Sequence, residues 1–168
     1  ILSTAFGAEL IGLFGSEEQK QLLAKLVAGE VMMATAITEP DAGCDVTGAS
    51  TRAVKEGDTW VINGSKMFIT NGDLADYLVV FCQTDPENPS RHERHSFILI
   101  PTKTPGYQSS KIRGKLGIRA SDTAEVVFKD LRVPVTNLVG VEGDGFRELM
   151  AFFNRTRLHI CAQAVGLA

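Results

Sequence analysis

The spacing of hydrophobic residues changes twice along this chain of 168 residues, and these changes limit the folds that it can adopt. Residues 1–14 and 16–29 place apolar side chains at helical intervals. Residues 31–134 instead show short apolar runs separated by turn residues, which is typical of strands. After the sequence VGVEGDG, helical spacing returns and continues to the last residue. This order predicts an α+β fold with segregated helical and sheet parts.

The second helical segment has recognisable ends. Ser16 is a good N-cap, Gln19 follows three positions later as in a capping box, and Gly29 is suited to end the helix. The last helix carries a broad apolar face, formed by Phe146, Leu149, Met150, Phe153, Ile160, Ala164 and Val165.

The strands between these helices are short and closely spaced, which predicts an antiparallel barrel-like sheet or a sandwich. The stretch STRAVKEGDTWVINGSKMFIT is expected to form three strands, with turns at Gly57-Asp58 and Asn63-Gly64. DYLVVFCQT, SFILIP and TAEVVFKDLRVP predict further strands, and DPENPSRHERH predicts a polar loop.

Composition excludes several classes of function. A net charge of −3 argues against a basic surface for nucleic acid. No apolar run reaches the ~18 residues of a membrane helix, and no signal peptide is visible. Cys44, Cys82 and Cys161 are scattered, so free thiols in a reducing compartment are expected.

Two strand ends carry residues suited to ligand chemistry. AITEPDAGCD, at 36–45, puts the hydroxyl of Thr38 and exposed backbone N–H groups into a turn, where they could bind a polar heterocycle or a phosphate. KMFITNG, at 66–72, places Phe68 and Thr70 on one face by strand alternation, where a ring could stack. Taken alone, a polar turn and a half-buried strand explain these stretches more simply.

Three other features have simpler interpretations. Thr156 and Arg157 interrupt the apolar face of the last helix, and a buried Arg157 would need a carboxylate, carbonyl or ligand as its partner. A solvated helix face or a subunit contact is the alternative.

His92, Glu93 and His95 have metal-binding spacing, but their flanks indicate a solvated loop. VGVEGDGF matches no nucleotide fingerprint and is interpreted as the lead-in to a helix.

Seven segments together resemble the acyl-CoA dehydrogenase family, in order and over nearly the whole chain: FGSEEQKQLLAKLVAGE, TEPDAGCD, INGSKMFITNG, KLGIRASDTAEVVFKDLRVP, GDGF, NRTR and AQAVGLA. The resemblance implies that residues 1–30 are the tail of an N-terminal helical domain. It implies a middle β domain at 31–140 that binds flavin and acyl-CoA, and the first helix of a C-terminal helical domain at 141–168. The uncapped ends of the chain favour a fragment of a longer protein.

The family resemblance also implies the cofactor FAD, oxidation of acyl-CoA to trans-2-enoyl-CoA, and a role in β-oxidation of fatty acids. Thr38 and its neighbours would hold the pyrimidine side of the flavin, Thr70 would contact its N5 region, and Phe68 replaces a frequent Trp against the ring. The implied cofactor residues are Thr35, Ala36, Ile37, Thr38, Glu39, Gly43, Cys44, Phe68, Ile69 and Thr70.

The implied substrate residues are Cys44, Asn154, Arg155, Thr156 and Arg157. Cys44 stands where family members usually carry Ser, which weakens one hydrogen bond. The reaction needs a carboxylate to remove the α proton. One branch of the family supplies a Glu at the position of Thr156, and a Thr cannot act as that base. The base is therefore expected beyond Ala168, and the isolated fragment is expected to be inactive.

The resemblance further implies an electron-transferring flavoprotein as partner, a homotetramer or homodimer, and a location in the cytoplasm or the mitochondrial matrix. No nucleic acid, metal or membrane span is expected. A related acyl-CoA oxidase, a flavin monooxygenase, or a non-catalytic module that binds acyl-CoA or flavin remain as alternatives.

Overall fold

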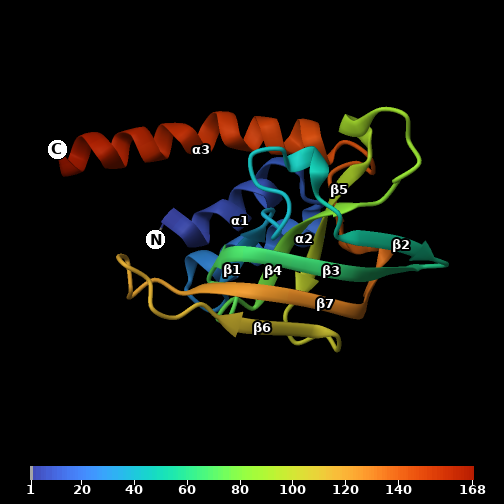
Figure 1. The fold of residues 1–168 in the computed structure, drawn as a ribbon, viewed down its shortest axis with the longest axis horizontal. Coiled ribbons are helices and arrows are strands. Elements are labelled where there is room, and N and C mark those ends of the chain that lie inside the picture. The colour runs from blue at the N-terminus through green and yellow to red at the C-terminus, as the bar shows by residue number, and fades with distance from the viewer. Residues whose placement is uncertain (1) are drawn as a thin grey trace.

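The computed structural model describes residues 2–168, with side chains described from residue 7 onward, so Ile1 of the predicted first segment lies outside the described residues. The described chain forms one curved sheet with helices against it (Figure 1). The helices are α1 (Leu2–Phe14), α2 (Glu17–Val27) and α3 (Gly145–Leu167). The strands are β1 (Met33–Ala36), β2 (Arg52–Glu56), β3 (Thr59–Thr70), β4 (Tyr77–Gln83), β5 (His95–Pro101), β6 (Tyr107–Lys111), β7 (Thr123–Pro134) and β8 (Leu138–Val139).

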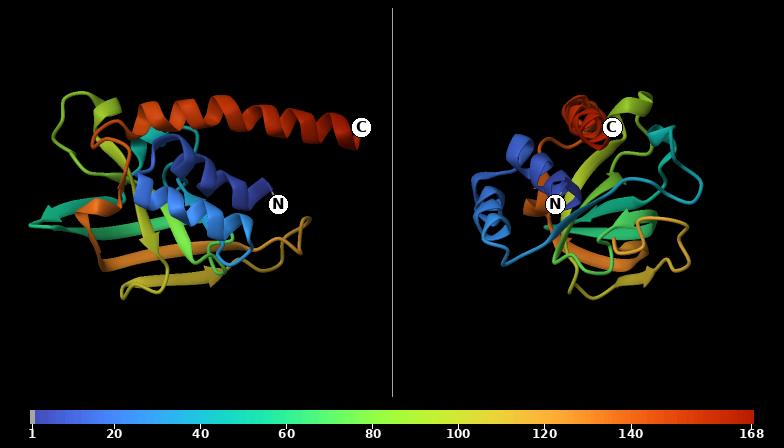
Figure 2. Two further views of the ribbon diagram at one scale, coloured as in Figure 1. Left: turned by 180° about the vertical axis from the view of Figure 1, so that it is seen from behind. Right: turned by 90° about the vertical axis from the view of Figure 1, so that its left-hand side faces the viewer.

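The sheet has the order β6-β7-β3-β2-β4-β5-β8, with β1 paired to β4. Most pairs are antiparallel, but β1 and β4 are parallel, and so is the short contact between β2 and β4. The predicted α+β fold with a barrel-like sheet is confirmed, and the expectation of a wholly antiparallel sheet is corrected at these two pairs. Figure 2 shows α1 and α2 against one side of the sheet, with α3 lying alongside α1.

Strand β4 explains why the sheet needs cover on both faces. Its central residues are all buried, as expected for a strand with no solvent-facing side. Leu78 and Val80 pack inside the curved sheet with Trp60 and other strand residues. Val79 and Phe81 alternate to the other face and pack with apolar residues of α1 and α3. The sheet therefore encloses one core and shares a second core with the helices.

The predicted capping box at the start of α2 is confirmed. Gln19 N–H donates to Ser16 Oγ at 3.2 Å, and Ser16 N–H donates to Gln19 Oε1 at 3.1 Å. The same Gln19 amide also donates to the carbonyls of Thr136 and Leu138, at 3.2 and 2.9 Å. One buried side chain thus starts the helix and fixes it against the strand β8 region.

Helix α3 is packed over its first part only. Leu149 and Phe152 are buried against the second core, and residues 157–168 are exposed. The C-terminal part of the helix extends past the rest of the molecule (Figures 1 and 2). No helix within residues 2–168 is long and apolar enough to span a membrane.

The predicted turn at Asn63-Gly64 is wrong. Strand β3 runs through this dipeptide without a break, and the pairing with β7 shifts register between Ile62 and Gly64, as at a β-bulge. Gly64 has φ +145°, and a Cβ there would lie 2.7 Å from atoms of Thr51. The glycine is therefore needed for a close strand contact, whereas the predicted turn at Gly57 does form.

Two further differences concern the strands. His95 was expected in the polar loop, but it is the first residue of β5 and is fully buried, stacked on Phe81 with ring centroids 4.6 Å apart. Strand β6 was not expected, because its sequence YQSSK is polar and its residues are largely exposed at the edge of the sheet. Edge pairing with β7, rather than burial, defines this strand.

Candidate functional site

The two strand ends singled out in the sequence meet in the structure. The N–H of Met67 in β3 donates to the carbonyl of Thr38, which follows β1, at 2.9 Å. The neighbouring ammonium of Lys66 donates to the carbonyl of Ile37 at 2.9 Å and to Glu39 Oε1 at 2.8 Å. Three hydrogen bonds thus attach the segment 37–39 to two consecutive residues of β3.

Glu39 is the centre of a buried polar network. Its Oε2 accepts from the N–H and the hydroxyl of Ser50, at 2.7 and 2.9 Å, and its Oε1 accepts from Thr51 N–H at 2.9 Å. Burial by itself would raise the pKa of this carboxyl, but the charge of Lys66 and these donors outweigh it and lower the pKa to about 2. Glu39 is therefore ionised and is a structural anchor of the turn.

The end of β3 does not follow simple strand alternation, from which a common face of Phe68 and Thr70 was expected, so that face stays a prediction without this support. The pairing with β7 shifts register between Lys66 and Ile69, and both of these residues are buried. Phe68 lies between them with φ +61° and is 65% exposed. A bulky residue with this backbone conformation is strained, and such strain is found mostly at functional sites.

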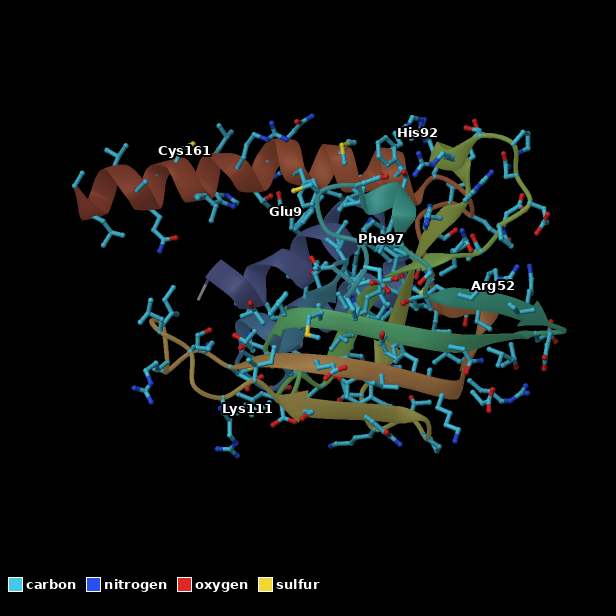
Figure 3. The ribbon with its side chains drawn as sticks, in the orientation of Figure 1. Glu9, Arg52, His92, Phe97, Lys111 and Cys161 are labelled. Carbon is cyan, nitrogen blue, oxygen red and sulfur yellow. The ribbon has the colours of Figure 1, made fainter. Side chains whose placement is uncertain are left out.

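The turn after Thr70 has a firm support. Asp122, which is 3% exposed, accepts from Asp73 N–H at 3.1 Å through its side chain and from Asn71 N–H at 3.3 Å through its carbonyl. Lys111 Nζ lies 3.4 Å from the other carboxylate oxygen of Asp122, near the end of β6 (Figure 3). The segment that carries Thr70 is thus held from β6 and β7.

A groove of about 450 Å³ lies between the end of β1 and the middle of α3. Its lining is mostly apolar with two hydroxyls and one cation: Thr35, Ile37, Phe152, Phe153, Thr156, Arg157 and Ile160. The hydroxyl of Thr35 is buried and has no hydrogen-bond partner within the described residues. An apolar groove with a few polar groups is the usual form of a small-molecule site, and an unpaired buried hydroxyl favours a ligand that supplies the missing partner.

The predicted residues of α3 divide into two sets. Thr156 is 7% exposed and lines the groove together with Arg157. Arg157 itself is exposed, and its Nε donates to the carbonyl of Phe153 at 3.0 Å, so the expected buried charge is wrong. Asn154 is exposed and does not line the groove. Arg155 pairs instead with Glu9 of α1, labelled in Figure 3, with Nε 2.7 Å from Oε1.

The remaining predicted cofactor residues differ in whether their side chains or only their backbone groups are accessible to a ligand. The side chains of Ala36 and Ile69 belong to the sheet core, so only their backbone can reach a ligand. Gly43 and Cys44 are exposed beside a tight turn, which is closed by paired backbone hydrogen bonds between Glu39 and Ala42. No group of three His, Cys, Asp or Glu in the described part of the chain is arranged to hold a metal.

The sequence interpretation missed two residues of this region. Phe152 is 3% exposed and lines the groove, whereas its neighbour Phe153 was assigned to the apolar face. Lys66 is 0% exposed and was passed over beside Phe68 and Thr70. The sequence did contain a signal for a buried ion pair, because Lys66 stands in the strand motif KMFITNG and Glu39 stands in the other motif, AITEPDAGCD.

Comparison with known proteins gives matches to one family, over residues 34–131 for the family model and over 98% of the chain for its relatives. A family model described as acyl-CoA dehydrogenase, middle domain, matches residues 34–131. A short-chain specific acyl-CoA dehydrogenase of Clostridium acetobutylicum is 46% identical over 98% of this chain and 43% of its own length. The solved butyryl-CoA dehydrogenase of Megasphaera elsdenii matches with a TM-score of 0.91 and 39% identity, over 98% of this chain and 43% of that chain.

A chain in a structure described as the electron transferring flavoprotein of Acidaminococcus fermentans matches with a TM-score of 0.92 and 41% identity, over 98% of this chain and 43% of that chain. The present chain thus spans less than half the length of these three proteins.

Proposed function

This chain belongs to the acyl-CoA dehydrogenase family, and from this premise we propose that the full-length protein oxidises an acyl-CoA to the trans-2-enoyl-CoA with FAD as its cofactor. The observation that carries the proposal is the junction of the β1 and β3 ends, where Met67 is hydrogen-bonded to Thr38. The strained, exposed Phe68 follows Met67 on β3, and the apolar groove with the unpaired hydroxyl of Thr35 lies at the end of β1.

The residues at this junction fit a flavin. The exposed ring of Phe68 offers an aromatic surface for stacking. The hydroxyls of Thr38 and Thr70, with backbone groups of residues 35–44, would hold the polar edges of the ring system. When bound, FAD supplies the hydride acceptor. Fixed N–H and O–H donors at its pyrimidine edge stabilise the negative charge of the reduced form.

The groove fits an acyl chain. Ile37, Phe153 and Ile160 provide an apolar lining, and Thr156 and Arg157 provide polar contacts nearby. No carboxylate lines this groove in residues 2–168, and a threonine cannot remove the α proton at neutral pH. We therefore expect the catalytic base to come from a segment beyond Ala168. Cys44 and Asn154 remain proposed substrate contacts. Arg155 is also a proposed substrate contact, but it would have to give up its ion pair with Glu9 to bind the substrate.

The same premise extends to organisation and partners. Residues 31–140 would be the middle domain, with 1–30 and 141–168 belonging to flanking helical domains. We propose an electron-transferring flavoprotein as the electron acceptor, supported by the likeness to a chain in a structure described under that name from Acidaminococcus fermentans. A homo-oligomer and a place in fatty acid oxidation follow from the family in the same way.

The proposal is tested on the purified full-length protein. Released cofactor is identified by chromatography, and the protein is then mixed without oxygen with acyl-CoA thioesters of increasing chain length. We expect FAD, and a loss of its visible absorbance with at least one thioester but not with free coenzyme A. A protein that carries no flavin, or whose flavin no thioester reduces, contradicts the proposal.

A further inference from the structure

We propose that Lys66 is a positioning residue of the flavin site, which acts through the carbonyl of Ile37 to direct the backbone N–H of Thr38 toward the cofactor. This inference rests on the proposed function. It adds a specific role for Lys66, which is not among the residues proposed to contact the cofactor or the substrate.

The position of Lys66 is unusual for a lysine. Its side chain is 0% exposed in the middle of a strand, with its ammonium 5.9 Å from the ring centroid of Phe81. Lysines are almost never fully buried unless paired. A buried ion pair adds little net stability over well-packed apolar residues, because removing two charges from water offsets their attraction. Stability of the sheet core alone is therefore a weak reason for this pair.

The contacts of the ammonium indicate another reason. Of its two hydrogen bonds, one goes to Glu39 Oε1 at 2.8 Å and one to the carbonyl of Ile37 at 2.9 Å. Glu39 is itself fixed by Ser50 and Thr51. The carboxylate therefore holds the ammonium in place, and the ammonium in turn holds one peptide group of the turn.

That peptide group joins Ile37 to Thr38. In a trans peptide the carbonyl and the N–H point in opposite directions. Because the Ile37 carbonyl faces Lys66 on β3, the Thr38 N–H faces away from β3. The next carbonyl, of Thr38, is also fixed toward β3 by Met67 N–H at 2.9 Å. The next N–H, of Glu39, is bonded to the Ala42 carbonyl at 2.9 Å. The orientation of Thr38 N–H thus depends on Lys66 and Met67.

The consequence for a bound flavin is electrostatic. A hydrogen-bond donor that is already fixed in place stabilises the negative charge that develops on the flavin ring, and it does not have to reorient during reduction. A donor that is free to rotate stabilises this charge less well. Loss of the ammonium lets the Ile37–Thr38 peptide rotate. The reduction potential of bound FAD should then become more negative and its affinity should fall, even where the fold is intact.

The test uses three variants of the full-length holoenzyme. Lys66→Met removes the ammonium and leaves Glu39 unpaired. The double variant Glu39→Gln/Lys66→Met also removes the unpaired carboxylate, while the amide oxygen at position 39 can still accept from the N–H and the hydroxyl of Ser50. Gln19→Met is the matched control, because Gln19 is another buried side chain that donates to carbonyls, those of Thr136 and Leu138, away from the segment 37–39.

Four quantities are measured: thermal unfolding, the reduction potential of the flavin, the dissociation constant of FAD, and the rate of flavin reduction by acyl-CoA. We expect the double variant to recover stability relative to Lys66→Met, yet to keep a more negative potential, weaker FAD binding and reduction slowed roughly tenfold or more. Gln19→Met should lose stability with an unchanged potential. A double variant with wild-type potential and FAD affinity, or a control that shifts equally, overturns the positioning role.

This outcome is separable from failure of the proposed function. If the wild-type protein holds no flavin or is not reduced by any thioester, the proposed function fails before the variants are compared. If the wild-type protein is reduced and the double variant matches it, only the role of Lys66 fails.

Discussion

Arg155 Nε of α3 lies 2.7 Å from Glu9 Oε1 of α1, and this ion pair joins the first and the last helix of the described chain. The Glu9 side chain is 12% exposed and the Arg155 side chain 63% exposed, so the carboxylate is the more buried partner. The pair lies beside the groove residues Thr156 and Arg157. It therefore adds a polar contact between α3 and α1 beside the buried packing of Leu149 and Phe152.

Arg155→Gln should destabilise the full-length protein by about 1 kcal/mol, because an exposed arginine contributes little by itself but leaves Glu9 less compensated. Urea unfolding measures this change. Arg147→Gln, which removes the exposed pair with Asp144 on the first turn of α3, is the control and should have a smaller effect. A raised KM for acyl-CoA with unchanged stability would instead assign Arg155 to the substrate.

Glu148 predicts a pH dependence of stability. This residue of α3 is 4% exposed; its Oε1 accepts from Val141 N–H at 3.1 Å, and its Oε2 has no partner within the described residues. Burial, with a smaller contribution from Asp144, raises its pKa from 4.5 to about 7, although Val141 and Arg147 act in the opposite direction. The folded state thus binds the proton more tightly than the unfolded state.

The sign follows from linkage. The stabilisation by protonated Glu148 is fully present below pH 4.5 and is lost as pH rises toward 7, an effect of up to roughly 3 kcal/mol. Glu148→Gln should therefore be more stable than wild type at pH 8 and equal to it near pH 4.5. Chemical unfolding at both pH values checks this, with Glu87→Gln in an exposed loop as the control. A variant less stable at pH 8 would show that the ionised carboxylate has a partner.

The three cysteines, all in the described part of the chain, should react with alkylating reagents at different rates. Cys44 and Cys161 are exposed, the latter on the free part of α3 (Figure 3). Cys82 is buried in β4, and burial raises the pKa of its thiol to about 12. Because the thiolate is the reactive form, we expect Cys82 to resist labelling in the native protein and to be labelled after denaturation. Native labelling of Cys82 would require the sheet to open.

Thr70→Val tests the second strand end. The change removes a hydroxyl and keeps the shape and β propensity of the residue. We expect a shifted flavin spectrum or potential and slower reduction by acyl-CoA, with little change in unfolding. An unchanged potential together with an unchanged reduction rate would remove Thr70 from the site.

Much of the fold was readable from local pattern. The capping box of Ser16 and Gln19, the buried strand β4 and the helical state of α3 are features of neighbouring residues, and each formed as predicted. The predicted apolar face of α3 is buried only in its first part, because Ile160 and Val165 are exposed. The mistakes came from contacts distant in sequence. Asn63-Gly64 has the composition of a tight turn, yet the close approach of Thr51 uses its glycine inside a strand.

The candidate site likewise combines features set by neighbouring residues, which were predicted, with contacts between distant residues, which were not. Both motifs were identified from their residues, but their connection through Lys66 and Glu39 depends on a register that no local pattern specifies. The bulge at Phe68 likewise breaks the alternation from which a shared face with Thr70 was derived. The position of Arg155 opposite Glu9 follows from how α3 packs alongside α1, which the sequence period alone does not determine.

The most direct test of the central claim, that the ends of β1 and β3 are shaped for a flavin rather than for packing, is Phe68→Gly. Phe68 has φ +61° and is 65% exposed, so glycine relieves roughly 1 kcal/mol of backbone strain and removes little buried surface. With FAD removed, the full-length variant should unfold at the same temperature as wild type or higher, so that weaker cofactor binding does not enter the comparison. Its dissociation constant for FAD should rise about tenfold through lost stacking. Lower stability with unchanged FAD affinity would contradict the account.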